Sequence, residues 1–365
     1  MPGVLVHEWI AQSGGSENVL EVMSEIYPSS DVLCLWNDSR GRFDDERVKE
    51  SWLARTPLRK SKALALPLMP LAWARRANRG YDWALVSSHL FAHHVRFSGA
   101  QPKRFVYVHS PARYIWTPDL DTRGASLPVR ITAAIVKPLD RWRARQTSEF
   151  AANSEFVRAR IRAAWDVDSR VIYPPVDVER IQEVQDWSKS LASDDRHILE
   201  SLPEAFVLGA SRFIPYKRLE DVIRAGEVSG QPVVLAGNGP ELESLRARAA
   251  ASAVDVHFVL SPSSPLLYAL FERCSVYVFP PVEDFGIMPV EAMAAGAPVV
   301  ANSVGGAAES VVDGATGALT DFGSDNDLAH AVTRAMGTTR EDRRTRARQF
   351  SKARFVGEIR EWVGA

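Results

Sequence analysis

Short apolar runs alternate with longer helical patterns along the whole of this 365-residue chain. The runs lack the polar residue at every second position that a half-exposed strand would carry, so they are typical of parallel strands covered by helices on both faces. We expect strands at Val4–Val6, Val32–Leu35, Trp83–Val86, Phe105–Val108 and Glu149–Ala152 in the first half, and at Ala205–Leu208, Val233–Ala236, Val256–Val259, Val276–Phe279 and Pro298–Ala301 in the second.

Two sets of strands in a chain of this length predict two hydrophobic cores. The expected fold class is therefore α/β, with two Rossmann-like, doubly wound domains. The prolines at 174 and 175 stop the first set, which predicts domains at residues 1–178 and 179–348. A last amphipathic helix, Phe350–Trp362 within residues 349–365, is expected to cross back onto the first domain. Ligands should lie at the carboxyl ends of the strands, where active-site loops of such folds gather.

Charge and cysteine content exclude several classes of protein. A formal net charge of −1 argues against a general nucleic-acid binder. Cys34 and Cys274 are the only cysteines, each in an apolar run, which argues against a disulfide framework or a zinc site. The first residues lack the basic and apolar parts of a secretory signal, and no uncharged apolar run is long enough to span a membrane. A reducing cytoplasm is the expected compartment.

One region of the first half is strongly basic. Between Ser51 and Tyr81 there is no acidic residue, and the apolar stretch from Leu64 to Leu71 and Trp73 lies among the cations. Cations beside apolar residues and Trp favour peripheral contact with an anionic membrane, whereas a pair of core-packing helices with solvated ends would look similar. The cations are Arg55, Arg59, Lys60, Lys62, Arg75, Arg76 and Arg79.

The stretch Glu283–Glu291 carries the clearest ligand signal. Gly286 permits a turn after the strand Val276–Phe279, and Pro289 suits the first turn of a short helix that ends before Gly296. The free amides around Gly286, Ile287 and Met288 then form a seat for an anion, flanked by the carboxylates of Glu283 and Glu291. A helix whose early Glu merely complements the dipole is the alternative.

Cations and glycines follow other strands. Arg212 and Lys217 come after the first strand of the second half and suit a diphosphate, although solvated surface cations would look the same. Gly237 lies in another strand-to-helix turn of that half. Gly14 and Gly15 open a helix after the first strand and permit close approach to a phosphate.

His109 directly follows the strand Phe105–Val108, so we rank it above the other histidines of the first half as a catalytic candidate. Two short acidic pairs, Asp119 with Asp121 and Asp166 with Asp168, do not follow buried strands and are interpreted as loop polarity. No cluster of His, Cys and Asp has the spacing of a metal site, and no nucleophile elbow occurs. The histidines ranked lower are His89, His93 and His94.

Taken together, the motifs resemble the family 4 retaining glycosyltransferases with the two-domain GT-B fold. The matching segments are His-Glu-Trp at 7–9 with Gly-Gly-Ser-Glu at 14–17, His-Ser-Pro at 109–111, Ala-Asn-Ser-Glu-Phe-Val at 152–157, Ile-Tyr-Pro-Pro-Val-Asp at 172–177, Arg-Phe-Ile-Pro-Tyr-Lys-Arg at 212–218 and the two glutamates at 283 and 291. The last of these looks most like bacterial GDP-mannose-dependent mannosyltransferases of O-antigen and exopolysaccharide assembly.

The resemblance implies roles for these residues around a central cleft. Glu283 would hold the hydroxyls of the donor sugar and Glu291 the ribose, while Arg212 and Lys217 neutralise the diphosphate. His109 would contact the sugar near its C6 hydroxyl and the reacting centre. Catalytic roles thus fall to His109, Glu283, Arg212 and Lys217, and donor binding to Gly14, Gly15, Arg212, Lys217, Gly237, Leu260, Glu283, Phe285, Gly286, Ile287, Met288 and Glu291.

The resemblance also implies chemistry without a metal or other cofactor, because fixed cations and amides stabilise the leaving diphosphate. Retention would proceed by front-face attack, with a phosphate oxygen accepting the proton of the acceptor. Backbone atoms around Leu260 would contact the base, although the segment Phe258–Leu266 lacks the glycine and acidic residues common in the family's nucleobase loop.

The expected function is therefore an α-mannosyltransferase that uses GDP-mannose and a lipid-linked saccharide acceptor. Transfer from a UDP-sugar (glucose, galactose or N-acetylglucosamine) and a non-catalytic nucleotide-binding scaffold are the alternatives. A dinucleotide oxidoreductase is rejected, because the glycines after the first strand do not have the GxGxxG spacing.

Overall fold

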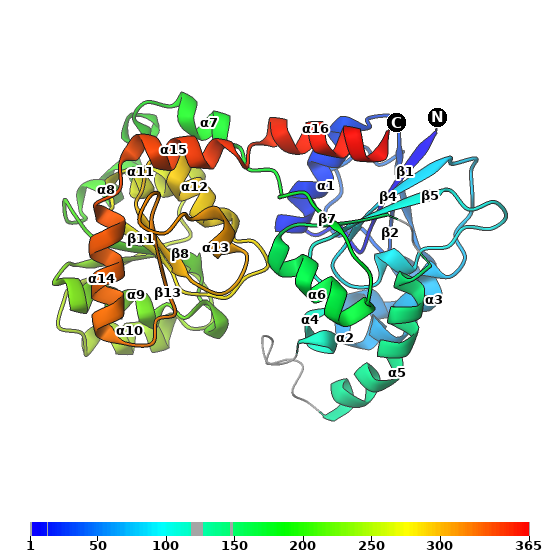
Figure 1. The fold of residues 1–365 in the computed structure, drawn as a ribbon, viewed down its shortest axis with the longest axis horizontal. Coiled ribbons are helices and arrows are strands. Elements are labelled where there is room, and N and C mark those ends of the chain that lie inside the picture. Colours follow the sequence, from blue (N-terminus) through cyan, green and yellow to red (C-terminus); the bar gives the residue numbers. More distant parts are fainter. Residues whose placement is uncertain (1, 13, 118–126, 147–148, 365) are drawn as a thin grey trace. The chain divides into compact units, whose positions relative to one another are not determined.

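The computed structural model describes the chain except residues 1, 13, 118–126, 147–148 and 365. The chain forms two compact units, each with its own parallel sheet (Figure 1). The first unit comprises residues 1–175 and 353–365, and the second comprises residues 176–352. The chain thus changes unit directly after the pair of prolines, Pro174 and Pro175, and returns after Lys352.

In the described part of the chain, the first unit contains a seven-stranded parallel sheet in the order β3-β2-β1-β4-β5-β6-β7. The five predicted strands are confirmed, whereas β3 and β7 were not predicted because they are short and partly exposed. The strands are β1 (Gly3–His7), β2 (Asp31–Cys34), β3 (Val48–Glu50), β4 (Trp83–Ser88), β5 (Lys103–Val108), β6 (Glu149–Ala152) and β7 (Arg170–Val171).

Helices cover both faces of this sheet, as uninterrupted apolar strands require. Val4 and Val6 of β1 pack into one core, which includes Ile161 and Trp165, whereas Leu5 packs into the core on the other face. The helical elements of the first unit are α1 (Gly15–Ile26), η1 (Trp52–Arg55), η2 (Pro57–Lys60), α2 (Lys62–Ala65), η3 (Leu66–Leu68), α3 (Met69–Trp73), η4 (Ala92–His94), α4 (Arg113–Trp116), α5 (Leu127–Ala144), α6 (Glu155–Trp165) and α16 (Lys352–Val363).

Helix α16 packs on the first unit, which confirms the predicted return of the last helix. The ring of Phe355 lies 5.7 Å from that of Tyr107, and the ring of Trp362 lies 5.4 Å from that of Phe105. Both contacts are edge-on, and all four rings belong to the core that also holds α1. The amphipathic pattern of the last residues therefore reflects a buried face on β5.

The second unit contains a six-stranded parallel sheet in the order β10-β9-β8-β11-β12-β13. Its five predicted strands are confirmed and β13 is added at the edge. Its strands are β8 (Val207–Arg212), β9 (Val233–Asn238), β10 (Val256–Leu260), β11 (Val276–Phe279), β12 (Val299–Asn302) and β13 (Ala318–Thr320). Its helical elements are α7 (Val178–Glu183), η7 (Trp187–Ser190), α8 (Ser193–Glu200), η8 (Pro215–Lys217), α9 (Glu220–Ser229), α10 (Leu242–Ala250), α11 (Ser264–Arg273), α12 (Ile287–Ala295), α13 (Ala307–Ser310), α14 (Asp325–Met336) and α15 (Arg340–Arg348).

Strand order reverses once in each sheet, and this reversal locates the ligand edge. In the first unit the chain builds outward from β1 to β3 and then adds β4 on the other side of β1. In the second unit it builds from β8 to β10 and then adds β11 on the other side of β8. Ligands of doubly wound folds bind at the carboxyl ends of the strands beside such a reversal. None of the described helices has the length and apolarity needed to cross a membrane.

Candidate functional site

The loop after β11 in the second unit has the predicted strand–turn–helix form. Gly286 has a φ of 85° and immediately precedes α12, which begins at Ile287 and ends before Gly296. A Cβ on Gly286 would lie 3.1 Å from the Cβ of Ala307, so both backbone conformation and space favour glycine there. Glu291 lies in the second turn of α12, because the helix begins at Ile287.

Lys217 and Glu283 meet at the point where the strand order of the second sheet reverses. Lys217 ends η8 after β8, Glu283 lies in the loop after β11, and the Lys217 ammonium forms an ion pair with Glu283 Oε1. The two side chains are only 10% and 19% exposed. The ammonium also lies 5.6 Å from the centre of the Phe279 ring, so the pair is set in a largely desolvated environment in which charge interactions are strong.

The ends of β8, β9 and β10 carry three further predicted residues on the same edge. The parallel register pairs Arg212 with Asn238, and Gly237 with Leu260. Gly237 has a φ of 143°, and a Cβ there would lie 1.8 Å from the carbonyl oxygen of Ser211, so no other residue fits. Arg212 is exposed, and Leu260 is 42% exposed. The sheet therefore presents a cation, a glycine and an exposed apolar side chain at the ends of three neighbouring strands.

A second pair of glycines, which the sequence interpretation did not include, holds the Glu283 loop. The amide of Gly306 donates to the carbonyl oxygen of Glu283 at 2.8 Å, and a Cβ on Gly306 would lie 2.1 Å from the carbonyl oxygen of Asp284. Gly305 has a φ of 105°. Asn302, at the end of β12, donates to the carbonyl oxygen of Pro280 at 2.8 Å. The loop that carries Glu283 is thus fixed by the neighbouring loop.

Glu291 lies in an environment that disfavours its charge. Desolvation, followed by the negative charge of Asp177, raises the pKa of Glu291 to about 7, while a hydrogen bond with Tyr268 acts in the opposite direction. Tyr268 is buried, and Glu291 keeps some exposure. A carboxyl group of this kind can accept hydrogen bonds from ligand hydroxyls when ionised, but it ionises near neutral pH. Phe285, another predicted donor residue, is buried and has its ring 5.6 Å from Phe350.

In the first unit, His109 lies at the carboxyl edge of the sheet, directly after β5. Its Nε2 lies 2.8 Å from Ser87 Oγ, and burial lowers the pKa of His109 to about 3, so the ring is neutral at pH 7.

Gly14 directly precedes α1, and Gly15 is the exposed first residue of that helix. A Cβ on Gly14 would lie 2.1 Å from Oε2 of Glu17, so the glycine makes room for this carboxylate.

Of the histidines ranked lower, His93 and His94 form a buried polar cluster with Asp140, whereas the ring of His89 lies 5.5 Å from that of His7. His94 Nε2 lies 2.8 Å and His93 Nε2 3.0 Å from Asp140 Oδ1. Asp140 Oδ2 accepts hydrogen bonds from the indoles of Trp116 and Trp165, each at 2.7 Å. The three ligand atoms of this group lie close enough for a metal ion. Since both carboxylate oxygens already have donors, we interpret the cluster as structural.

The structure describes one of the two acidic pairs, Asp166 with Asp168. Asp166 and Asp168 follow α6, where Asp168 pairs with Arg158 at 2.9 Å and Asp166 ends the helix in a left-handed conformation. Both are structural, as expected from their loop position. Asp119 and Asp121 lie outside the described residues.

Glu8 is a buried carboxyl that lies in the His-Glu-Trp segment at 7–9, but the sequence assigned it no role. It follows β1 and is inaccessible to solvent, and its Oε1 accepts from the amides of Leu90 and Ala92 at 2.8 and 2.7 Å. Burial raises the pKa of Glu8 to about 7, against the effect of these amides. Glu8 therefore fixes the segment after β4 that leads to His93.

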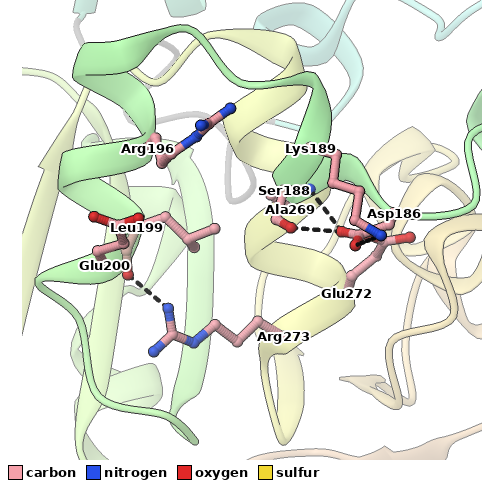
Figure 2. A pocket seen from close by; sticks show the side chains of 9 residues that line it. All are labelled: Asp186, Ser188, Lys189, Arg196, Leu199, Glu200, Ala269, Glu272 and Arg273. Carbon is pink, nitrogen blue, oxygen red and sulfur yellow. Dashed lines mark hydrogen bonds and ion pairs between the residues drawn. The ribbon is translucent and has the colours of Figure 1, made fainter.

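A hollow of about 660 Å³ in the second unit lies away from this edge. It is formed by η7, α8 and the last turns of α11, as Figure 2 shows. Two of its cations already have partners: Lys189 pairs with Asp186 at 3.2 Å, and Arg273 donates to the carbonyl oxygen of Leu199 at 2.6 Å. Because α11 runs back from the carboxyl edge, its last turns lie at the opposite edge of the sheet, and we assign this hollow no ligand.

The basic region between Ser51 and Tyr81 has an exposed and a buried side. Trp73 is fully buried in the core, so for this residue the core-packing alternative holds. Instead, Trp52, Leu64 and Leu71 are 48%, 67% and 63% exposed. The cations that are exposed beside them are Arg55, Lys60, Lys62, Arg75 and Arg79.

Two family descriptions match this chain in succession. Residues 13–180 match "Glycosyltransferase Family 4" and residues 193–354 match "Glycosyl transferases group 1". Each description covers most of one unit, and together they include every strand of the two sheets except β1.

Relatives and solved structures agree with this result. A GDP-mannose-dependent alpha-(1-6)-phosphatidylinositol monomannoside mannosyltransferase of Mycolicibacterium smegmatis is 32% identical over 209 residues, which are 53% of each chain. An alpha-1,3/1,6-mannosyltransferase of Neurospora crassa is 25% identical over 260 residues, or 60% of this chain and 55% of that one. The chain thus spans about half the length of the curated relatives it matches.

Solved structures resemble this chain over nearly its full length. HepE of Anabaena in complex with UDP-glucose has a TM-score of 0.70 at 20% identity and 99% coverage of both chains. A sucrose-phosphate synthase of Thermosynechococcus elongatus has a TM-score of 0.71 at 19% identity, with 99% of this chain and 98% of that chain covered. At these identities the likeness establishes the shared two-domain fold.

Proposed function

We propose that this chain, which belongs to the family 4 glycosyltransferases, is a retaining, metal-independent α-mannosyltransferase that uses GDP-mannose and a lipid-linked saccharide. The observation that supports a nucleotide-sugar donor most directly is the ion pair of Lys217 with Glu283 at the strand-order reversal of the second sheet. A cation for phosphate and a carboxylate for sugar hydroxyls lie there within contact distance of each other, as a sugar phosphate requires.

The donor would bind along the carboxyl edge of the second unit. Lys217 and the exposed Arg212 would neutralise the diphosphate, and the first amides of α12, at Ile287 and Met288, would add fixed dipoles. Such preorganised charges stabilise the negative charge that develops on the leaving phosphate. Glu283 would accept hydrogen bonds from the sugar, and Glu291 from the ribose.

The choice of GDP-mannose rests on the relatives rather than on the base-binding loop. The mycobacterial relative is named for GDP-mannose, and the fungal relative is also a mannosyltransferase. The base would lie against Gly237 and the exposed side chain of Leu260, which are paired in the parallel register. The structures of HepE hold UDP and UDP-glucose. Because HepE has low sequence identity to this chain, we infer only the shared fold from it and not the donor.

The proposal of a lipid-linked acceptor is supported by the exposed side of the basic region. Trp52, Leu64 and Leu71 together with neighbouring cations suit the surface of an anionic bilayer, where such an acceptor would be embedded. We expect the protein to co-sediment with phosphatidylglycerol vesicles but not with phosphatidylcholine vesicles. Replacement of Trp52 and Leu64 by Ser should reduce this binding.

A donor screen tests the proposal. The purified protein is incubated with GDP-mannose, UDP-glucose, UDP-galactose and UDP-N-acetylglucosamine in EDTA, and released or transferred sugar is detected by mass. We expect consumption of GDP-mannose that persists in EDTA. Consumption of a UDP-sugar alone would contradict the donor assignment, and a requirement for added metal would contradict the metal-independent mechanism.

A further inference from the structure

Three polar side chains form a hydrogen-bonded row at the strand-order reversal of the first sheet. His7 ends β1, Ser87 lies in the adjacent β4, and His109 follows β5, the next strand along. His7 Nδ1 lies 3.0 Å and His109 Nε2 lies 2.8 Å from Ser87 Oγ. His7 and Ser87 are inaccessible to solvent, whereas His109 is partly exposed. Nδ1 is thus the nitrogen of His109 that remains for a ligand.

The protons of this row are limited in number. Burial lowers the pKa of His7 to about 4 and that of His109 to about 3, so each ring carries one N–H at neutral pH. The Ser87 hydroxyl has one proton and can donate to only one of the two rings. Both rings could donate to the two lone pairs of Ser87 Oγ only if the hydroxyl proton pointed elsewhere, and in the described part of the chain this buried oxygen has no partner besides the two rings. Since that arrangement would leave the hydroxyl proton without an acceptor, the row runs in one direction: either His7 donates to Ser87 and Ser87 to His109, or His109 donates to Ser87 and Ser87 to His7.

The other ring nitrogen of His7, Nε2, decides between the two directions of donation. His7 Nε2 is buried and has no hydrogen-bond partner in the described part of the chain. If His7 donates from Nδ1, this buried atom is a bare lone pair; in the reverse direction it is an N–H without an acceptor. Unpartnered buried N–H groups are the rarer of the two in proteins, which favours donation from His7 towards His109.

We propose that His7 and Ser87 are positioning residues that hold His109 as the Nδ1–H tautomer, so that His109 meets its ligand as a neutral hydrogen-bond donor. The ligand atom would be an oxygen of the donor sugar, and only this part of the inference rests on the proposed function. Because Nδ1 already carries a proton, His109 cannot accept the proton of the acceptor hydroxyl there, and that proton must leave by another group, such as a phosphate oxygen.

The tautomer can be observed directly in the full chain without any substrate. The protein is labelled with ¹⁵N-histidine, and two-bond ¹H–¹⁵N correlation spectra at pH 7.5 distinguish the Nδ1–H, Nε2–H and charged forms of its eight histidines. Signals of His7 and His109 are assigned by their loss in His7→Asn and His109→Gln. We expect both rings as Nδ1–H tautomers. An Nε2–H or charged His109 in the wild type would overturn the proposal.

Two serine variants test the role of Ser87 in the row. Ser87→Ala should release His109 to the Nε2–H form that histidine prefers in water, whereas Ser87→Thr should preserve Nδ1–H. Ser88→Ala is the matched control, because Ser88 is equally buried but lies beside His93, 3.2 Å from its Nδ1. An unchanged His109 tautomer in a folded Ser87→Ala variant would contradict the positioning role.

Kinetics add a second readout that separates this inference from the proposed function. With the nucleotide sugar that the enzyme consumes, we expect Ser87→Ala to lower kcat at least tenfold with little change in KM, and Ser87→Thr to restore it. An unchanged kcat would overturn the positioning role. A wild-type protein that consumes no nucleotide sugar would contradict the proposed function, while the tautomer in the spectra would still support or overturn the assignment of His109.

Discussion

At the scale of single residues, the contact between Lys217 and Glu283 carries most of the proposed donor site. Both side chains are mostly buried, so removal of one partner leaves the other charge without compensation in a poorly solvated place. Their roles towards phosphate and sugar differ, but their positions depend on each other. This dependence can be measured separately from activity.

We expect Lys217→Met and Glu283→Gln each to lower the stability of the second unit by about 2 kcal/mol. The double variant should lose clearly less than the sum, because the charge that each single variant leaves unpaired is then absent. Thermal unfolding of the four proteins measures this coupling. Arg246→Met, which breaks an exposed pair with Glu243, serves as control and should change stability by less than about 0.5 kcal/mol. Strictly additive effects would show that the ion pair does not form.

Glu291 predicts a pH dependence of stability. Its pKa rises from 4.5 in an exposed chain to about 7 in the fold, so the folded state binds a proton more tightly than the unfolded state. Ionisation therefore costs stability, which should fall as pH rises from about 4.5 to about 7. Glu291→Gln should remove this dependence and be more stable than the wild type at pH 8, by up to about 3 kcal/mol. Urea unfolding at pH 5 and pH 8 tests this; a difference between wild type and variant that is equal at both values would contradict it.

Single residues of both units show what the sequence could and could not predict. Glu283, Gly286 and Lys217 could be found, because each follows an apolar strand and the carboxyl ends of parallel strands share one edge. Ser87, Glu8 and Gly306 could not, because their roles depend on neighbours far away in the sequence. The burial of Trp73 could not be predicted either, because a Trp that neighbours cations in the sequence can lie on the surface or in the core.

At the scale of elements, the loop after β12 determines how firmly the loop after β11 is held. Gly306 leaves no room for a side chain against the backbone of Asp284. The strands of the sheet interiors could be predicted from their apolar runs, but β3 and β13 lie at edges and give a weaker pattern. The dependence of one loop on the next is a packing property that no local pattern encodes.

Gly306→Ala should displace the Glu283 loop and weaken binding of the donor at least tenfold, or about 1.4 kcal/mol. Its backbone conformation suits alanine, so the effect would come from the clash rather than from backbone strain. Gly314→Ala is the complementary control: its φ of 77° is strained for alanine, but nothing lies near the added Cβ. Titration calorimetry with GDP measures both. Equal affinities in wild type and Gly306→Ala would contradict the role of this contact.

At the scale of the whole molecule, the chain returns to the first unit through α16. The crossing back could be predicted from the amphipathic pattern of the last residues, whereas the contacts with Phe105 and Tyr107 required the fold. Since Phe355 and Trp362 are buried against β5, the first unit is completed by residues that follow the second unit in sequence. Its stability should therefore depend on the last helix.

We expect Phe355→Ala to destabilise the first unit by about 3–4 kcal/mol, because it removes a fully buried ring from the core. Hydrogen exchange should then accelerate in β1 and β5 but not in β8 and β11. Glu361→Ala, at an exposed position of the same helix, is the control and should leave both sheets unchanged. Equal acceleration in both sheets, or in neither, would contradict the assignment of α16 to the first unit.

The central claim is that the carboxyl edge of the second sheet binds a nucleoside diphosphate sugar, and hydrogen exchange with and without GDP-mannose tests it most directly. We expect slower exchange in residues 211–219 and 283–291, and loss of this protection in Lys217→Met. Protection confined to other segments, or no protection at a concentration of GDP-mannose that the protein consumes, would contradict the claim.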